Sequence, residues 1–151
     1  MDDILIKTTK PSIVEGGIFS DARGNISHVN SFNFNEVKRF YTIHHPDLSV
    51  IRAWQGHQFE TKYFYVIQGA FTVAWVEIDN WKNPSQNLKA DSIALTADNS
   101  RILIIPPGYA NGIKALLNDS KIIVFCNFAL QESLDEKIRF DSNLWFDWSS
   151  V

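Results

Sequence analysis

The chain has 151 residues, of which 45% are hydrophobic and 13% aromatic, and its formal net charge is -3 at pH 7. This length and composition predict one domain over residues 1–151 with a sizeable core. The acidic balance gives no electrostatic reason to bind nucleic acid or an anionic membrane, and we expect neither as a partner. The first residues, MDDILIKTTK, do not resemble a secretory leader, and no apolar run is long enough to cross a membrane. We therefore expect a cytoplasmic protein.

Short strand-like segments dominate the sequence and are separated by turn-forming residues. No long amphipathic helix pattern lies between them, which predicts an all-β sandwich or barrel. The expected strands are rich in Val, Ile, Phe and Tyr. They are SVIRAW at 49–54, TKYFYVIQ at 61–68, AFTVAWVEI at 70–78, SRILIIP at 100–106 and SKIIVFCNF at 120–128.

The segments between these strands lead to three further expectations. Residues 30–40, NSFNFNEVKRF, are expected to hold one helical turn. Gln68 and Gly69 are expected to join two strands in a tight hairpin, with Gly69 at positive φ. The end of the chain, residues 135–151, carries large aromatic residues. We expect these aromatics to pack on the domain or on a second subunit, because so much apolar surface is rarely left exposed.

Two segments resemble the paired motifs of the cupin superfamily. In WQGHQFETKYFYVIQG, His57 precedes Lys62 by five residues, and Gly69 follows Lys62 after seven. Gln55 and Lys62 stand where a metal-binding cupin has histidine and glutamate, and in PPGYAN the final Asn111 replaces a histidine. One imidazole beside an ammonium is a poor set of metal ligands. We expect no metal and no other cofactor, while a metal-dependent cupin enzyme remains an alternative.

Within the cupins, the closer resemblance is to dTDP-4-dehydrorhamnose 3,5-epimerases and dTDP-sugar 3,4-ketoisomerases, over roughly residues 18–148. This resemblance implies a cupin-type jelly-roll barrel, a homodimer that exchanges an N-terminal strand, and a nucleotide-sugar substrate. The segments that carry it are FSDARGNISHV, VIRAWQGH, the spacing from lysine to glycine, IPPGYANGI and IRFDSNLWFDW.

The resemblance also assigns side chains to the substrate. Arg23, in the Asp-x-Arg-Gly segment, and Arg52 are the expected ligands of the diphosphate, because guanidinium groups bind phosphate oxygens in pairs. Gln55 occupies the place of the family's catalytic histidine and cannot act as a base. Asn111 and His28 are further candidates for substrate contact, Asn111 from the second cupin motif and His28 near a subunit boundary.

The expected chemistry is proton transfer next to a keto group. His57 is the candidate base, since its side chain titrates near neutral pH, and Lys62 is the candidate cation for the enolate oxygen. The family's proton-donating tyrosine falls at Phe125, and its C-terminal carboxylate partner of the base falls beyond residue 151. A relative that binds a sugar nucleotide without turning it over is therefore a second alternative. His44 and His45 are expected to be loop residues without a role.

Overall fold

The computed structural model describes residues 9–151 and is built mainly of antiparallel strands. Residues 1–8, part of the segment expected not to be a leader, lie outside the described residues. The elements are β1 (Ser12–Glu15), β2 (Gly17–Asp21), β3 (Gly24–His28), β4 (Arg39–His44), β5 (Ile51–His57), β6 (Lys62–Gln68), β7 (Ala70–Glu77), β8 (Asp91–Thr96), β9 (Arg101–Ile105), β10 (Tyr109–Ala115), β11 (Lys121–Cys126), α1 (Leu130–Glu136), β12 (Ile138–Arg139) and η1 (Trp148–Ser150).

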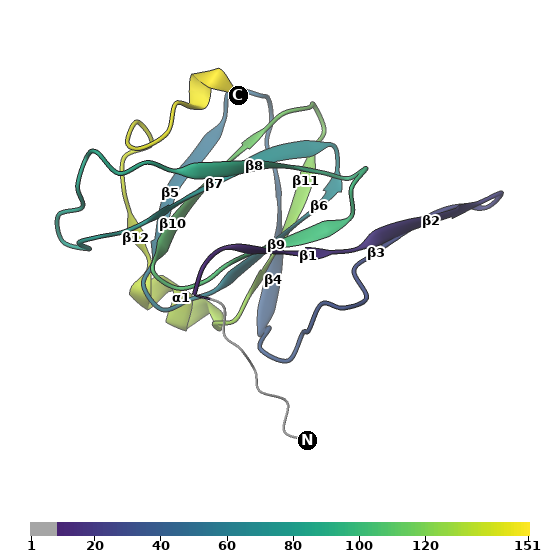
Figure 1. Ribbon diagram of the computed structural model, residues 1–151, viewed down its shortest axis with the longest axis horizontal. Helices are drawn as coiled ribbons and strands as arrows, with labels where there is room; N and C mark the ends of the chain where they lie inside the picture. Colours follow the sequence, from purple (N-terminus) through teal and green to yellow (C-terminus); the bar gives the residue numbers. More distant parts are fainter. Residues whose placement is uncertain (1–8) are drawn as a thin grey trace.

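Two five-stranded sheets face each other. The first sheet has the order β1-β9-β6-β11-β4, and the second has the order β12-β5-β10-β7-β8. Strands β2 and β3 pair only with each other and project from the body as an arm, visible on the right of Figure 1. This arrangement confirms the expected all-β jelly-roll fold.

Alternation of side chains along each strand separates the inside of the barrel from the outside. On β6, Phe64 and Val66 enter the central core, whereas Tyr63 and Tyr65 pack on the outer face with Phe32. The aromatic and β-branched residues that identified the strands in the sequence therefore fill both faces of the first sheet. The outer face of this sheet is also apolar, because the segment before β4, which includes Phe32 and Val37, packs on it.

The chain's C-terminal segment covers the outer face of the second sheet. Trp148 packs there with Trp54, and the two ring centroids lie 5.7 Å apart. The ring centroid of Trp145 lies at the same distance from that of Trp54. The expectation that the C-terminal aromatics pack on the domain is confirmed.

The connection at Gln68 and Gly69 differs from the expected hairpin. Gly69 has φ of +72°, as expected, but β6 belongs to the first sheet and β7 to the second. The glycine therefore turns the chain from one sheet into the other. Backbone bonds fix this corner, because Ala97 N–H donates to the Gly69 carbonyl and Ala70 N–H donates to Ser120 Oγ.

The helical turn expected in residues 30–40 does not form in that described segment, which has two short turns, one closed by Val37 N–H donating to the Phe34 carbonyl, and then enters β4 at Arg39. The helix that does form is α1, which is only seven residues long and therefore too short to show a helical pattern in the sequence. Its leucines Leu130 and Leu134 remain exposed, so it carries no buried stripe.

Within residues 9–151, no helix is long and apolar enough to cross a membrane.

Replacing Gly69 by Ala should lower the free energy of unfolding by about 2 kcal/mol, because a Cβ is disfavoured at positive φ and would clash with Ser120 Oγ. Urea denaturation measures the change. In a Ser120→Ala background the same replacement should cost less, and an equal cost in both backgrounds would show that the corner is not tightly packed.

Candidate functional site

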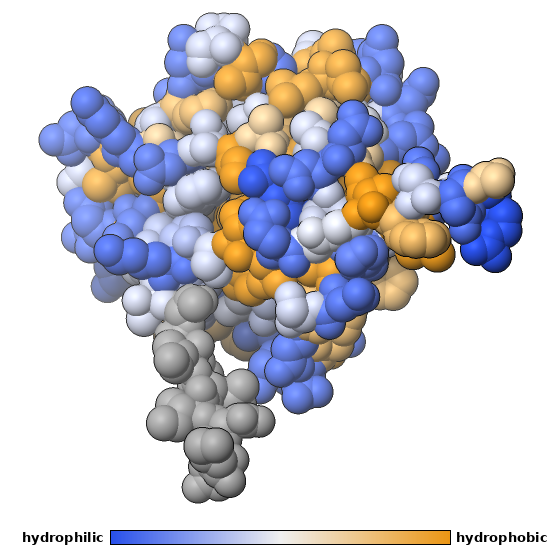
Figure 2. All heavy atoms as spheres, turned by 45° about the vertical axis from the view of Figure 1, so that its right-hand side comes forward, coloured by the Kyte–Doolittle hydropathy of each residue, from blue (hydrophilic) through white to orange (hydrophobic). Residues whose placement is uncertain are grey.

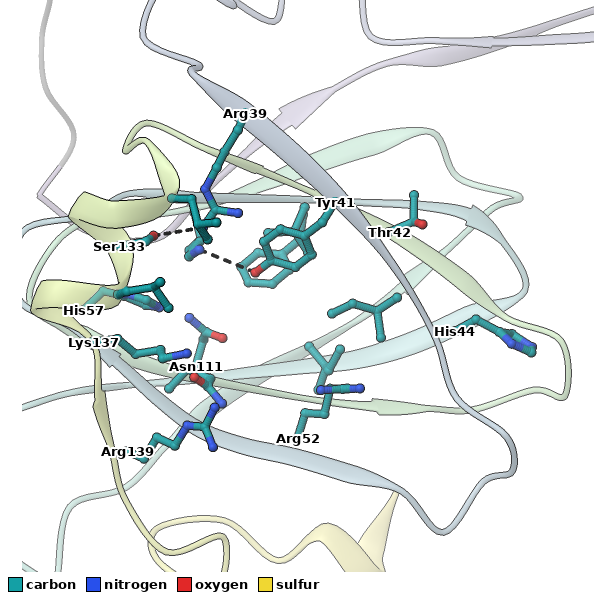
Figure 3. A pocket seen from close by; sticks show the side chains of 18 residues that line it. Arg39, Tyr41, Thr42, His44, Arg52, His57, Asn111, Ser133, Lys137 and Arg139 are labelled. Carbon is teal, nitrogen blue, oxygen red and sulfur yellow. Dashed lines mark hydrogen bonds between the residues drawn. The ribbon is translucent and has the colours of Figure 1, made fainter.

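A cavity of about 430 Å³ opens between the two sheets at the end of the barrel that carries α1. Residues of β4, β5, β6, β10, β11, α1 and β12 line it, so both sheets and the C-terminal segment contribute. Figure 3 shows Arg39 and Tyr41 entering from β4, opposite Arg52, Asn111 and Arg139. The volume and the mixture of polar and apolar walls suit a small-molecule site.

Five of the residues expected from the sequence meet in this cavity: Arg52, Gln55, His57, Lys62 and Asn111. Gln55 and His57 are two residues apart on β5, so their side chains leave the same face. Asn111 pairs with Gln55 across β10 and β5. A bulge in that pairing brings Arg52 to the same face, although it lies three residues from Gln55.

Two expected residues, Arg23 and His28, do not line the cavity of this chain. Arg23 lies at the tip of the arm, where its side chain is 86% exposed and pairs with Asp21 at 2.6 Å. His28 ends β3 at the base of the arm. Because the arm points away from the barrel, neither residue can touch a ligand held in its own chain's cavity (Figure 1). Their binding roles remain predictions that depend on a second chain.

Four titratable side chains form a buried charge cluster in which His57 and Lys62 also line the cavity: His57, Glu60, Lys62 and Glu136. Nδ1 of His57 lies 3.2 Å from a carboxylate oxygen of Glu60 and 3.2 Å from one of Glu136. Nζ of Lys62 lies 2.9 Å from the other oxygen of Glu60. Glu60 has no exposed surface, so these partners replace the water that a carboxylate needs.

The cluster ties α1 to the barrel. Ser133, on α1, donates its hydroxyl to Glu60 and accepts a hydrogen bond from Arg39 on β4. Glu136, the last residue of α1, accepts backbone N–H groups from Gln58 and Glu60. Glu60 and Glu136 were not expected from the sequence. The sequence marks neither residue as part of a site, because Glu60 lies in the loop between β5 and β6 and Glu136 is 79 residues from His57 along the chain.

The cluster shifts the pKa values of its members. Burial disfavours the imidazolium of His57, but hydrogen bonds to Glu136 and Glu60 outweigh burial and raise the pKa of His57. Burial also disfavours the carboxylate of Glu60, yet its bonds to His57, Ser133 and Lys62 lower the pKa of Glu60 to about 2. Glu60 is therefore ionised, and His57 is a stronger proton acceptor than an isolated histidine.

Lys62 also contacts Tyr41 and Cys126. Its Nζ donates to the phenol oxygen of Tyr41 at 3.4 Å and to Sγ of Cys126 at 3.2 Å. Burial would lower the pKa of Lys62, but Tyr41, Cys126 and Glu60 together raise it. Burial raises the pKa of Tyr41, although Lys62 opposes part of this shift. The cavity thus holds a protonated phenol beside an ammonium.

Three members of the charge cluster are residue types that bind metals. One ligand atom from each of His57, Glu60 and Glu136 lies within 4.8 Å of the others. However, Lys62 already pairs with Glu60, and both oxygens of Glu136 accept backbone N–H groups. A divalent cation would have to lie close to the ammonium of Lys62, which Coulomb repulsion disfavours. The donor set fits an ion-pair network better than a metal.

Three cations that the sequence did not single out also line the cavity: Arg39, Lys137 and Arg139. Lys137 and Arg139 flank Ile138 at β12, and Arg139 pairs with Gln55 on β5. Their alternate spacing was visible in KIRF, but a two-residue strand leaves no recognisable pattern. With Arg52 and Lys62, they make the cavity strongly electropositive although the chain is acidic.

The sequence resemblance placed the proton donor's position at Phe125. In the structure, Phe125 lies on the outer face of the first sheet with Phe32 and Phe34, whereas Val124 points into the cavity. The phenol in the cavity comes instead from Tyr41, which pairs with Val124 across β4 and β11. Tyr41 was missed because one tyrosine among many strand aromatics carries no distinguishing pattern.

Several solved structures share this fold. A variant of the 3,4-ketoisomerase from Thermoanaerobacterium thermosaccharolyticum, in complex with TDP-4-keto-6-deoxyglucose, is 16% identical with a TM-score of 0.68, over 89% of this chain and 90% of that one. The Bacillus anthracis dTDP-4-dehydrorhamnose 3,5-epimerase, with TDP and PPi bound, is 21% identical with a TM-score of 0.69, over 91% and 83%. The Legionella pneumophila 3,5-epimerase, in complex with dTDP-4-keto-L-rhamnose, is 19% identical with a TM-score of 0.69, over 88% and 73%.

Sequence comparison decides the family. No curated protein matches the chain. The family model described as dTDP-4-dehydrorhamnose 3,5-epimerase matches residues 9–151, nearly the whole chain. The resemblance inferred from the motifs is thereby confirmed, and the chain belongs to the dTDP-4-dehydrorhamnose 3,5-epimerase family.

Proposed function

We propose that this protein binds a dTDP-linked 4-keto-6-deoxyhexose and moves a proton at a carbon next to its keto group. The observation that carries this proposal is the cavity itself, in which His57, Tyr41 and Lys62 lie among further cationic side chains. Family membership supports the reaction class. The keto-sugar nucleotides bound to the Thermoanaerobacterium and Legionella enzymes support the substrate class.

The cations divide the cavity between two tasks. Lys62 is committed to the charge cluster and to Tyr41, so it acts on the reacting end of the sugar. Arg52, Lys137 and Arg139 enter from the second sheet side and are available to an anion (Figure 3). Guanidinium and ammonium groups in a partly desolvated cavity bind a diphosphate strongly. We assign the diphosphate to these three side chains.

The acid and base roles follow from what each side chain can do with a proton. Gln55 cannot titrate, so His57 is the base, oriented by carboxylates at its Nδ1. Tyr41 is a protonated phenol and supplies the acid. Lys62 stabilises the negative charge that develops on the phenol oxygen of Tyr41 and on the keto oxygen of the substrate.

A single base, His57, suits proton transfer between two neighbouring carbons. This favours ketoisomerisation over epimerisation, which acts at two separate carbons. His57 removes the proton from C3, and Tyr41 protonates the oxygen on C4, which gives an enediol. His57 then gives its proton to C4, and the hydroxyl on C3 gives its proton to the Tyr41 phenolate, which completes the isomerisation and restores both groups. Each step uses a group that lines the cavity.

A homodimer is part of the proposal, because it would bring Arg23 to a ligand. The arm exposes Phe19 (54%) and Ile26 (61%), the edge strand β4 exposes Phe40 (62%), and Figure 2 shows apolar surface at the base of the arm. Exposed apolar surface of this kind marks a contact surface. The second copy would cover the apolar arm and receive Arg23 beside its cavity.

Solvent exchange tests the reaction. In D₂O, the protein should incorporate deuterium next to the keto group of dTDP-4-keto-6-deoxyglucose, as read by NMR. His57→Asn and Tyr41→Phe should each slow incorporation about 10²–10⁴-fold, because each removes a proton carrier. Tyr65→Phe, which alters an outer-face phenol, should leave the rate unchanged. Tight binding of the sugar nucleotide without any exchange would mean a binding protein instead.

The pH profile tests the role of Glu136. As pH falls through the raised pKa of His57, Nε2 becomes protonated and cannot accept a proton, so kcat/KM should fall with a midpoint above 6.5. Glu136→Gln removes a carboxylate that raises this pKa and should move the midpoint to lower pH. Asp135→Asn, an exposed change on the same helix, is the control and should leave the midpoint in place. If the midpoint of the kcat/KM profile is the same in Glu136→Gln as in the wild type, His57 is not the titrating base.

Light scattering after size exclusion tests the dimer. The wild-type chain should elute as a dimer, and Phe19→Asp should shift it toward the monomer, because a charge at this apolar contact cannot be buried cheaply. Leu117→Asp replaces a comparably exposed apolar residue outside the arm and should leave the dimer intact. A monomeric wild type would remove the basis for any role of Arg23 at the site.

A further inference from the structure

His45, which was expected to be a loop residue without a role, is a buried histidine next to the cavity. It follows β4, is only 5% exposed, and packs edge-on against Phe71 with ring centroids 5.7 Å apart. Its Nε2 accepts a hydrogen bond of 3.2 Å from Nε of Arg52. His45 does not line the cavity that Arg52 lines; it lines a separate hollow of about 300 Å³. It therefore stands behind Arg52, on the side away from the substrate.

The bond to His45 determines which donors Arg52 can present. A guanidinium carries five N–H donors in one rigid plane. The Nε donor is taken by His45, which fixes the plane and leaves the four donors on the two terminal nitrogens. Two parallel donors at fixed spacing match two oxygens of a phosphate group.

The bond also determines the protonation of His45. Nε2 can accept only when the ring is neutral, so the ring proton is on Nδ1. Nδ1 is buried and has no hydrogen-bond partner within the described residues 9–151. A buried N–H without a partner is destabilising, and an apolar residue would fill this position at lower cost. Among the described residues, the side-chain hydrogen bond that the imidazole makes is the one to Arg52, and this contact points to its role.

We propose that His45 is a positioning residue that holds the Arg52 guanidinium in the orientation that binds the substrate's diphosphate. This inference rests on the proposed function, because Arg52 is assigned there to the diphosphate. It makes the neutral imidazole of His45 a condition for tight substrate binding. Protonation would remove the lone pair that accepts from Arg52 and would put a second cation beside it.

The charged groups around His45 set the direction of this pH dependence. Arg52 faces it from β5, His44 precedes it, Asp47 lies in the following turn, and Asp119 lines the same hollow from the turn after β10. Burial, Arg52 and His44 lower the pKa of His45, and Asp47 opposes them only in part. The ring is therefore neutral at neutral pH, and substrate affinity should fall when acid protonates it.

A double-mutant cycle with dTDP-glucose as the probe tests the positioning role. At about pH 7.5, His45→Phe should raise the Kd about tenfold, and in an Arg52→Ala background it should cause no further loss. His45→Gln offers an amide oxygen to Nε of Arg52 and should stay within about threefold of the wild type. An equal loss from His45→Phe in both backgrounds, or no loss in either, would overturn the proposal.

The pH dependence of binding gives an independent test that does not need His45→Phe to fold. The diphosphate of dTDP-glucose does not titrate near neutrality, so wild-type affinity lost as the pH falls below about 6.5, through the lowered pKa of His45, reports the protein. His45→Gln cannot titrate and should lose clearly less affinity over that range. The same loss in both proteins would contradict the proposal.

Failure of the proposed function would be recognised separately. If wild-type protein does not bind dTDP-glucose at all, the substrate assignment is wrong. Inorganic pyrophosphate then replaces dTDP-glucose in the cycle at fixed pH, because the anion affinity of Arg52 does not need the nucleoside. His45→Phe should still weaken binding only where Arg52 is present, and an effect without Arg52 would overturn the positioning role.

Discussion

The buried carboxylate of Glu60 is the constraint on which the functional end of this barrel depends. A carboxylate without exposed surface destabilises the fold strongly unless cations and donors surround it. Here Lys62, His57 and Ser133 surround it. The three partners come from β6, β5 and α1, so satisfying one charge fixes the relative positions of three elements. His57, Lys62 and Ser133 also line the cavity, so this fixed cluster forms part of the cavity wall.

The same interaction prepares the site for chemistry. The carboxylates hold the His57 ring by Nδ1, and Lys62 is held beside the phenol of Tyr41. Neither group has to reorganise when a substrate arrives, which is the condition under which fixed charges accelerate proton transfer most. The acidic chain and the electropositive cavity are compatible, because the positive charge is gathered on a few inward-facing positions.

The sequence predicted those features that follow from strand periodicity. Gln55 and His57 share a face because they are two residues apart, and Asn111 meets them through the neighbouring strand. The corner at Gly69 shows what a short sequence segment cannot predict. Its positive φ was predictable, but whether a glycine turn closes a hairpin or changes sheets depends on pairing with distant strands.

The rest of the site depends on contacts between residues that are far apart along the chain. Glu136 reaches His57 from a short helix near the C-terminus, and Tyr41 enters from an edge strand. A sequence motif records the spacing within one segment, so it pointed to Phe125 and could not record that the neighbouring strand supplies the phenol. The arm carrying Arg23 is the reverse case, a recognisable motif that the fold places away from its own chain's cavity (Figure 1).

Carboxylates at Nδ1 raise the proton affinity of His57. NMR titration of imidazole resonances measures this directly, with the His57 signal assigned among the four histidines from its loss in His57→Asn. We predict a pKa for His57 above 6.5 in the wild-type protein and a lower one in Glu60→Gln. A His57 pKa below 6.5, unaffected by Glu60→Gln, would contradict the account.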